Sequence, residues 1–532
     1  MARTSTRERP DREEVLWPVQ KACPACGHPM RLRYDNARTL VTLAGPVRLR
    51  LKIRRCERDD CARHHRPYRP EAEGAIALPD HEFGLDVIAL VGRLRHREHR
   101  SVPEIHQRLR ARGVAIAERS VTNLLDRYDE LLATSLSDSA RLRRRLATQG
   151  RVILALDGLQ PDVGHEVLWV IRDCLSGEVL LARSLLSGTA GDLAPLLREV
   201  ASAVGVPVAG VVSDGQTSIR RAVEQALPGV PHQLCHFHFL REAARPIFEA
   251  DRHAKTVLKK HVRGVRPIER AAEQANDPQA AVVQGYCAAV RSAITDDGHA
   301  PLAAQRAEAQ AAAGEDHRQP RAGGRKRGAA PPLAKLQQLI GNGLVQTAAL
   351  WPDIERAYPW VHKAAHILNN HDAEDAATGQ RRFDGLVGAM TRHRDCAGSL
   401  SEAIEHFGKV TRSYRPGLFH CYSVPDLSRT NNDLEHEFGS QRYHERRASG
   451  RKTASPAVVL RGEARLIAAI ATRQHPPSGA DLGSADRERW NELRQQLDRR
   501  RQARIRRTRF RRDPDAYLAQ LEQKAYQLTL PA

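Results

Sequence analysis

The segment from residue 151 to 239 most constrains the fold, because apolar runs typical of buried strands alternate there with amphipathic helices. Runs around Ser176-Gly177 indicate a hairpin, and Thr189-x-x-Asp192 can cap the helix that follows. The order β-β-β-α-β-α-β predicts an α/β domain with a mixed sheet. The expected elements are residues 151–156, 166–172, 178–184, 193–204, 208–212, 218–226 and 232–239, the last as a strand or strand end.

Two of these strands run into an Asp-Gly pair, at Asp157 and at Asp214. A lone Asp-Gly after a strand is commonly just a turn, so the signal is the pair within one domain. Ligands gather outside the carboxyl ends of strands in open α/β sheets. Two carboxylates there would form a hard oxygen site for Mg²⁺ or Mn²⁺. Phosphodiester chemistry by two metal ions needs such a site and a third carboxylate.

The third carboxylate is expected from a polar stretch, residues 429–452, that precedes an apolar helix. Thr430 or Asn431 would cap a helix there and put Glu435 in its first or second turn. Glu437 is a rival in the same helix start. Asp433 is a weaker rival, since a first-turn acid is also favoured by the helix dipole.

One set of residues spans most of the chain after residue 150: Asp157, Asp214, Cys235-x-x-His238 and Asn432-x-x-Glu435. This pattern resembles the RNase-H-fold DDE transposases, above all the Mutator-like elements and their bacterial insertion-sequence relatives, over about residues 150–470. The resemblance implies an RNase-H-like core with a helical insertion between the second Asp and the Glu. It also implies that Asp157, Asp214 and Glu435 are the catalytic triad and hold two Mg²⁺ or Mn²⁺ ions. A long basic linker inside the insertion departs from the family pattern.

In that family the Cys235-x-x-His238 pair lies near the active site. Taken alone, the pair could be half of a zinc site completed by His362 and His366, which are spaced for one helix face. A strand-end Cys and His satisfied by core hydrogen bonds is the favoured interpretation. A Cys-His nucleophile is disfavoured because no third, orienting group is evident.

Four cysteines near the amino terminus form two close pairs, Cys23-x-x-Cys26 and Cys56-x4-Cys61. The segment between them predicts a β-hairpin, with strands at 39–43 and 47–53. Two such pairs suit a tetrahedral, structural Zn²⁺ site that leaves no open position for chemistry. A histidine could replace one thiolate, and the candidates are His28, His64 and His65.

Three helices are expected next, at 84–96, 101–113 and 119–132, the second opened by a Ser101–Glu104 capping box. The last two fit a helix-turn-helix in which Arg119, Thr122 and Asn123 face outward to DNA. A generic three-helix bundle is the alternative. DNA binding is favoured because the zinc pattern and the net charge point the same way.

The chain has 84 Lys and Arg against 63 Asp and Glu in 532 residues, a formal charge of +21 that indicates a polyanionic partner. Nine cysteines in so long a chain do not make a disulfide scaffold. No apolar run is long enough to span a membrane, and the start lacks the apolar core of a signal peptide. We therefore expect double-stranded DNA and no membrane as partners, and a cytoplasmic, nucleoid-associated bacterial protein.

The expected function is that of an insertion-sequence transposase, which binds element ends and performs metal-dependent cleavage and strand transfer as a homodimer or larger assembly. The rivals are a non-catalytic DNA-binding regulator derived from a transposase and a structure-specific nuclease on the same fold. The expected parts are a zinc-ribbon-like DNA-binding domain (1–80), a helix-turn-helix domain (81–140), the first part of the core (150–245), a helical insertion (246–425) with a flexible basic linker at about 299–332, the last core helix (426–480) and a basic C-terminal helix or tail (481–532).

Overall fold

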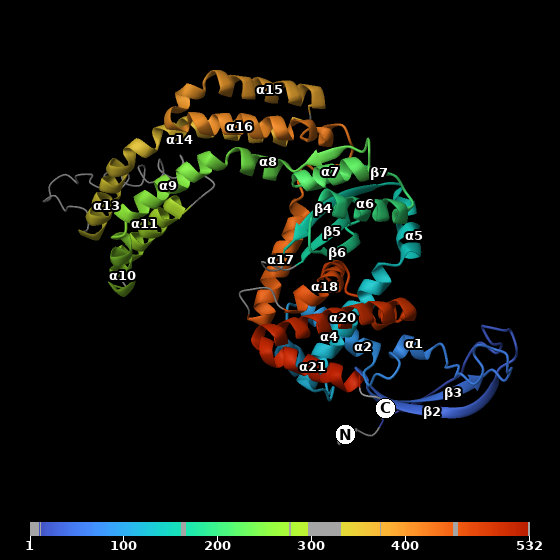
Figure 1. The fold of residues 1–532 in the computed structure, drawn as a ribbon. Helices are drawn as coiled ribbons and strands as arrows, with labels where there is room; N and C mark the ends of the chain where they lie inside the picture. The colour runs from blue at the N-terminus through green and yellow to red at the C-terminus, as the bar shows by residue number, and fades with distance from the viewer. Residues whose placement is uncertain are drawn as a thin grey trace. The chain divides into compact units, whose positions relative to one another are not determined.

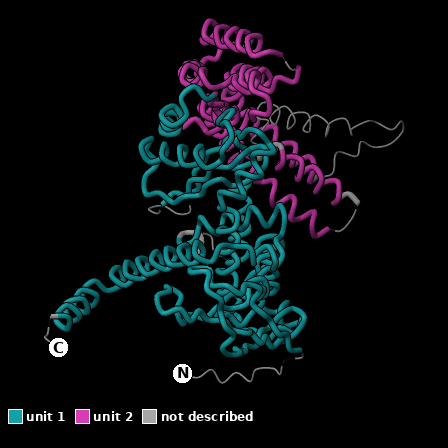
Figure 2. The backbone as a smooth tube through the Cα atoms, turned by 90° about the vertical axis from the view of Figure 1, so that its right-hand side faces the viewer, with its two compact units in different colours: residues 1–211, 217–230, 431–532 teal, residues 212–216, 231–430 magenta. Residues whose placement is uncertain are grey.

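The computed structural model describes residues 10, 12–160, 166–275, 278–295, 331–372, 374–450 and 456–529. The chain folds into two compact units, of which unit 1 comprises residues 1–211, 217–230 and 431–532, and unit 2 comprises 212–216 and 231–430 (Figure 2). In sequence, unit 2 is therefore mainly one long insertion into unit 1. The expected basic linker lies outside the described residues except for 331–332.

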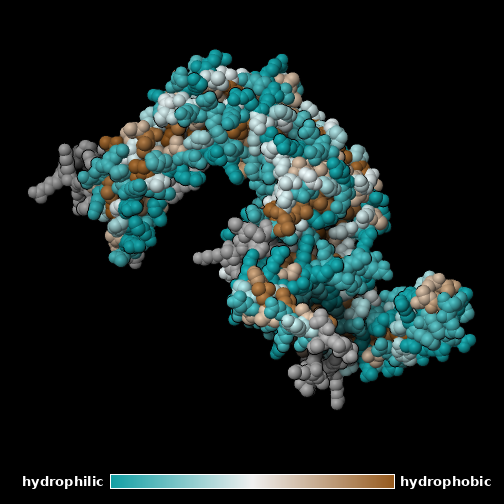
Figure 3. Space-filling view, in the orientation of Figure 1, coloured by the Kyte–Doolittle hydropathy of each residue, from teal (hydrophilic) through white to brown (hydrophobic). Residues whose placement is uncertain are grey.

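The amino-terminal part of unit 1 is a three-stranded sheet in the order β1-β3-β2, with β1 (Arg12–Leu16), β2 (Arg31–Thr42) and β3 (Gly45–Arg55) (Figure 1). Strands β2 and β3 pair antiparallel, so the expected hairpin is present and extends beyond the expected bounds. Val47, Leu49, Leu51 and Ile53 are buried, and the residues that alternate with them point outward. The surface over β2 and β3, at lower right in Figure 3, is mostly hydrophilic.

Five helices follow: α1 (Glu73–Ile76), α2 (Leu85–His96), α3 (Val102–Ala111), α4 (Glu118–Leu136) and α5 (Ser139–Gln149). The expected capping box opens α3, because Ser101 Oγ accepts from the Glu104 N–H while Glu104 accepts from the Ser101 N–H. Helices α2, α3 and α4 bury their apolar faces in one core, which Ala468, Leu482 and Trp490 of the C-terminal helices complete.

A five-stranded sheet in the order β6-β5-β4-β7-β8 follows in the chain, with β4 antiparallel to β5 and β5 antiparallel to β6. The Val152 N–H donates to Pro207 O at 3.0 Å, so β4 and β7 begin side by side and run parallel. Helices α6 and α7 pack on this sheet through apolar residues such as Leu193 and Ile219. The elements are β4 (Val152–Leu159), β5 (Val167–Asp173), β6 (Val179–Leu185), α6 (Ala190–Val204), β7 (Val208–Ser213), α7 (Thr217–Ala226) and β8 (His232–Leu234).

A mixed α/β architecture is thus confirmed, but the last strand is shorter than the expected range of 232–239. Strand β8 ends at Leu234, and helix α8 (His236–Ala243) begins two residues later. The Cys235 N–H donates to Ser213 O at 2.8 Å, after which the chain turns into the helix.

The described residues of unit 2 are mainly helical, and Phe239, Phe383 and Phe407 lie in its core. After α8 its main helices are α9 (Arg245–His261), α10 (Val265–Ala275), α11 (Pro278–Thr295), α13 (Pro331–Thr347), α14 (Pro352–Asn369), α15 (Ala376–Arg392) and α16 (Ser401–Tyr414).

The chain then returns to unit 1 with α17 (Asn432–Ser449), α18 (Pro456–Gln474), α19 (Gly479–Gly483), α20 (Arg487–Arg512) and α21 (Pro514–Thr529). Helix α18 packs against α4 and β6, and α20 buries only Trp490 and Leu497. Within the described ranges, no helix combines the length and apolar character that crossing a membrane requires.

The contact between α2 and α4 yields a stability prediction. A Cβ on Gly92 would lie 2.2 Å from the ring of Tyr128, which is fully buried and hydrogen-bonded to Thr472 at 2.7 Å. We expect Gly92→Ala to lower the free energy of unfolding by about 1–3 kcal/mol through overpacking, measured by denaturant unfolding. The matched control is Gly439→Ala on α17, where no atom lies within 4 Å of the new Cβ. That change should stabilise by about 0.5–1 kcal/mol, and equal effects of the two changes would contradict the packing argument.

Candidate functional site

The four amino-terminal cysteines come together as the sequence predicts. Cys23 and Cys26 lie in the turn before β2, and Cys56 and Cys61 follow β3. Their sulfur atoms lie within 4.8 Å of one another, with Cys23–Cys61 at 3.8 Å and Cys26–Cys56 at 3.6 Å. Ligands about 2.3 Å from a tetrahedral metal ion are separated by about 3.8 Å, so the spacing fits zinc. A buried four-cysteine cluster that could hold such a metal is therefore confirmed.

The histidine substitutes are not needed for this group, which the four thiols complete. His64 Nε2 lies 3.3 Å from Asp59, and its ring stacks on His65 at 3.7 Å.

The thiols of the cluster differ in acidity. The backbone N–H of Ala25 lowers the pKa of Cys23 to about 7. The pKa of Cys56 is raised to about 12, because burial and its thiol neighbours outweigh the lowering effect of the Arg58 N–H. A bound dication would favour all four thiolates, so zinc binding must release protons.

The geometry of the four thiols predicts the zinc content, and their protonation predicts how zinc affinity depends on pH. We expect one zinc per chain by elemental analysis, and we expect Cys56→Ser to lose it, because three thiolates leave an incomplete tetrahedron. Zinc affinity should fall as the pH falls, since protons then compete for the thiols. The control is Cys174→Ser, which removes a thiol from β5–β6 and leaves the cluster intact. Full zinc retention by Cys56→Ser would refute the four-thiolate site.

Asp157 lies within strand β4, two residues before the strand ends, and not beyond it as expected. The strand is longer because Asp157 and Gly158 still pair with Val170 and Trp169 of β5. The half-buried Asp157 carboxylate accepts a hydrogen bond from the Gly158 N–H at 2.7 Å.

Glu435 is brought to β4 by the start of helix α17. Asn431 is the N-cap residue, but its side chain makes no capping bond. It is 2% exposed, and its amide donates to Leu156 O at 3.4 Å, next to Asp157. The Glu435 N–H bonds to Asn431 O at 3.2 Å, so the half-buried Glu435 lies one turn further along α17.

The two rivals of Glu435 have other surroundings. Glu437 forms an ion pair with Arg473 of α18. Asp433 is exposed in the first turn of α17, where a carboxylate favours the helix dipole.

Asp214 belongs to unit 2, where it directly follows β7 and is held by a tight turn. Its carboxylate accepts from the Gln216 N–H at 2.9 Å. Gly215 has φ of +84°, and Tyr414 of α16 donates its hydroxyl to Asp214 O at 3.2 Å. The Tyr414 ring also covers Gly215, where a Cβ would lie only 2.6 Å from it. Nothing in the sequence around Tyr414 indicated this contact, which joins residues 200 positions apart.

Cys235 and His238 also belong to unit 2. Cys235 is fully buried, and its N–H bond to Ser213 O places it beside the residue that precedes Asp214. His238 is half-buried on α8. His362 packs on the Tyr358 ring at 4.9 Å, and in the described part of the chain neither His362 nor His366 belongs to a group that could hold a metal.

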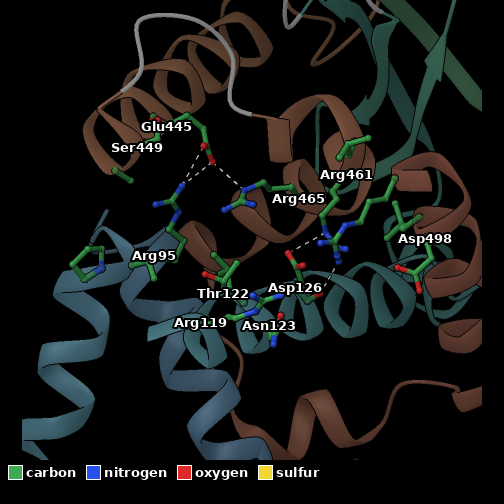
Figure 4. Close-up of a pocket in the computed structure, with 17 residues that line it drawn as sticks. Arg95, Arg119, Thr122, Asn123, Asp126, Glu445, Ser449, Arg461, Arg465 and Asp498 are labelled. Atoms are coloured by element: carbon green, nitrogen blue, oxygen red, sulfur yellow. Dashed lines mark hydrogen bonds and ion pairs between the residues drawn. The ribbon is translucent and has the colours of Figure 1, made fainter. Parts of the chain in front are cut away.

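Arg119, Thr122 and Asn123 are exposed on the first two turns of α4, as expected for outward-facing residues. All three line a cavity of about 650 Å³ that α17, α18 and α20 complete (Figure 4). The involvement of these C-terminal helices was not anticipated from the sequence.

Comparison of the sequence with protein-family models finds no match. Comparison with curated proteins finds none either.

The turn at Asp214 gives a testable consequence. Gly215→Ala forces an L-residue into the left-handed region and against Tyr414, so we expect faster amide hydrogen exchange in residues 213–217. Gly229→Ala is the matched control, since its φ is +81° but no atom lies within 4 Å of the new Cβ. Exchange at 213–217 that is unchanged in Gly215→Ala would contradict the role of this contact.

Proposed function

We propose that this protein is a DNA transposase of the DDE type that cleaves and joins phosphodiester bonds with Mg²⁺ or Mn²⁺. The observation that carries the proposal is the Asn431 hydrogen bond to Leu156, which draws the start of α17 to the strand that bears Asp157. This contact joins residues 275 positions apart, and it supports a common site for Asp157 and Glu435. A mixed sheet with parallel β4 and β7 is compatible with an RNase-H-like core.

Asp157, Asp214 and Glu435 would hold the metal ions. Half-buried carboxylates form a donor set suited to hard divalent cations. Bound ions would activate the attacking water or 3′-hydroxyl and stabilise the leaving oxygen. The roles of the protein are to hold the three carboxylates in place and to orient the DNA strand against them. The ion pair of Glu437 with Arg473 supports Glu435 as the third ligand.

The amino-terminal modules would recognise the element ends. The four-cysteine cluster would bind structural zinc and stabilise the sheet of β1–β3, whose outer face carries Arg48, Arg50 and Lys52. Helices α3 and α4 would form the helix-turn-helix. The surplus of 21 positive charges supports a DNA partner, and pairing of two element ends implies at least a dimer on DNA.

Two other functions use the same features differently. A regulator derived from a transposase would bind DNA without cutting it, and a structure-specific nuclease would cut without regard to element ends. Terminal inverted repeats that flank the gene, bordered by short direct repeats, would favour the transposase over both.

Asp157→Asn tests the catalytic proposal on DNA that carries both gene flanks. We expect the wild type to cut at the element ends with Mg²⁺ or Mn²⁺. The variant should be slower by about 10²-fold or more, because loss of one ligand removes several kcal/mol of transition-state stabilisation. Binding of the same DNA should be unchanged.

Three variants of α17 complete the test. Glu435→Gln should match Asp157→Asn, whereas Glu437→Gln should retain most cleavage. Asp433→Asn is the control, because it removes an exposed carboxylate from the same helix turn. Specific DNA binding without metal-dependent cleavage by the wild type would favour the regulator, and cleavage independent of the element ends would favour the nuclease.

A further inference from the structure

The cavity beside α4 lies entirely within unit 1 and is lined from several segments of the chain (Figure 4). Arg119, Thr122 and Asn123 form one wall, on the first two turns of α4. Helices α17, α18 and α20 form most of the rest, with Arg501 of α20 among the lining residues, and Arg95 of α2 and the start of α3 complete it. Its volume of about 650 Å³ is far larger than a single water site and is typical of pockets that bind ligands.

The deep wall of the cavity consists of arginines that are already neutralised. Arg95 and Arg465 both bind Glu445, at 3.2 Å and 3.0 Å. Arg461 binds Asp126 at 3.2 Å and Glu130 at 2.7 Å, and Arg465 also lies 3.9 Å from Asp129. These groups are largely buried and hold one another in fixed positions, so they give the cavity a rigid, polar lining.

The positive charge that remains lies with the exposed arginines. Among the described residues, neither Arg119 nor Arg501 forms an ion pair with a carboxylate within 4.0 Å. Asp498 also lines the cavity and offsets one of these two charges. The cavity is thus lined by two exposed guanidinium groups against one exposed carboxylate, and this surplus favours an anion.

We propose that this cavity binds a segment of the phosphodiester backbone, so that α4 meets nucleic acid together with α17 and α20 and not as a free recognition helix. Guanidinium groups bind phosphate oxygens bidentately, and a Thr hydroxyl and an Asn amide add further donors. The inference rests on the proposed function, because it is that function which identifies the anion as DNA. It changes the expected role of Arg119, Thr122 and Asn123 from reading base edges to positioning the backbone.

Arg501→Ala separates this composite site from a free helix-turn-helix, because Arg501 lies on α20 and outside the expected DNA-reading helices. Arg499→Ala is the matched control, since it removes the same charge from the same helix about 200° around its axis. Both residues are exposed, so we expect both variants to fold, which circular dichroism can verify. Binding to duplex DNA is measured by fluorescence anisotropy over a range of salt concentrations.

We expect Arg501→Ala and Arg119→Ala each to weaken binding by about 5–10-fold and to reduce the salt slope by about one, equally for element-end and unrelated sequences. Arg499→Ala should have a smaller effect on both quantities. An Arg501→Ala variant that behaves like Arg499→Ala would overturn the composite site. An Arg119→Ala variant that loses only sequence preference would also overturn it, because that result would favour α4 as a free recognition helix that reads base edges.

Two further outcomes are distinguishable. If the wild type binds no DNA even at low salt, the proposed function fails together with the inference. Inorganic phosphate tests whether the cavity binds a free phosphate ion and not the DNA backbone. If phosphate raises the Tm of the wild type but not of Arg119→Ala, while both bind DNA equally, the cavity holds a free phosphate and the backbone assignment is wrong.

Discussion

The buried ion pairs around Glu445 are the constraint on which the arrangement of unit 1 depends. Glu445 of α17 binds Arg95 of α2, 350 positions earlier in the chain, and Arg465 of α18. Close by, burial lowers the pKa of His96, and its ring nitrogen lies 2.8 Å from the buried Asp129. Removing one partner of such a pair leaves an uncompensated buried charge and costs about 3–5 kcal/mol. These contacts therefore fix α2, α4, α17 and α18 relative to one another.

Helix α17 is consequently anchored at both ends. Asn431 ties its start to β4, and Glu445 ties its last turns to the front helices. Glu435 and Glu445 are ten residues apart, which is about 15 Å along a helix. In the proposed function, one rigid helix thus carries a metal ligand near its start and part of the DNA-binding cavity near its end. A DNA strand held by the cavity would have a defined distance from Glu435.

Local sequence signals predicted the elements well, but they did not predict contacts between residues far apart in the chain. The expected strand at 208–212 is β7, and the expected helix at 193–204 is most of α6, because apolar spacing and the Thr189 cap are local properties. Four cysteines in two pairs were enough to predict their cluster. The strand expected through residue 239 was wrong after Leu234, since an apolar run does not show where a ladder ends. Two contacts, of Tyr414 with Asp214 and of Glu445 with Arg95, depend on tertiary packing that leaves no local pattern in the sequence.

The location of the charge surplus adds a physical argument for a polyanionic partner. Where arginines are buried in unit 1, carboxylates match them closely, as around Glu445 and Glu130. Among the described residues of unit 1, the positive charges that no carboxylate matches therefore lie largely on exposed surfaces. In unit 1 these include the outer face of β3, the mouth of the cavity and the basic second half of α20. A bound small anion could neutralise only one such surface, whereas a DNA duplex is long enough to reach several.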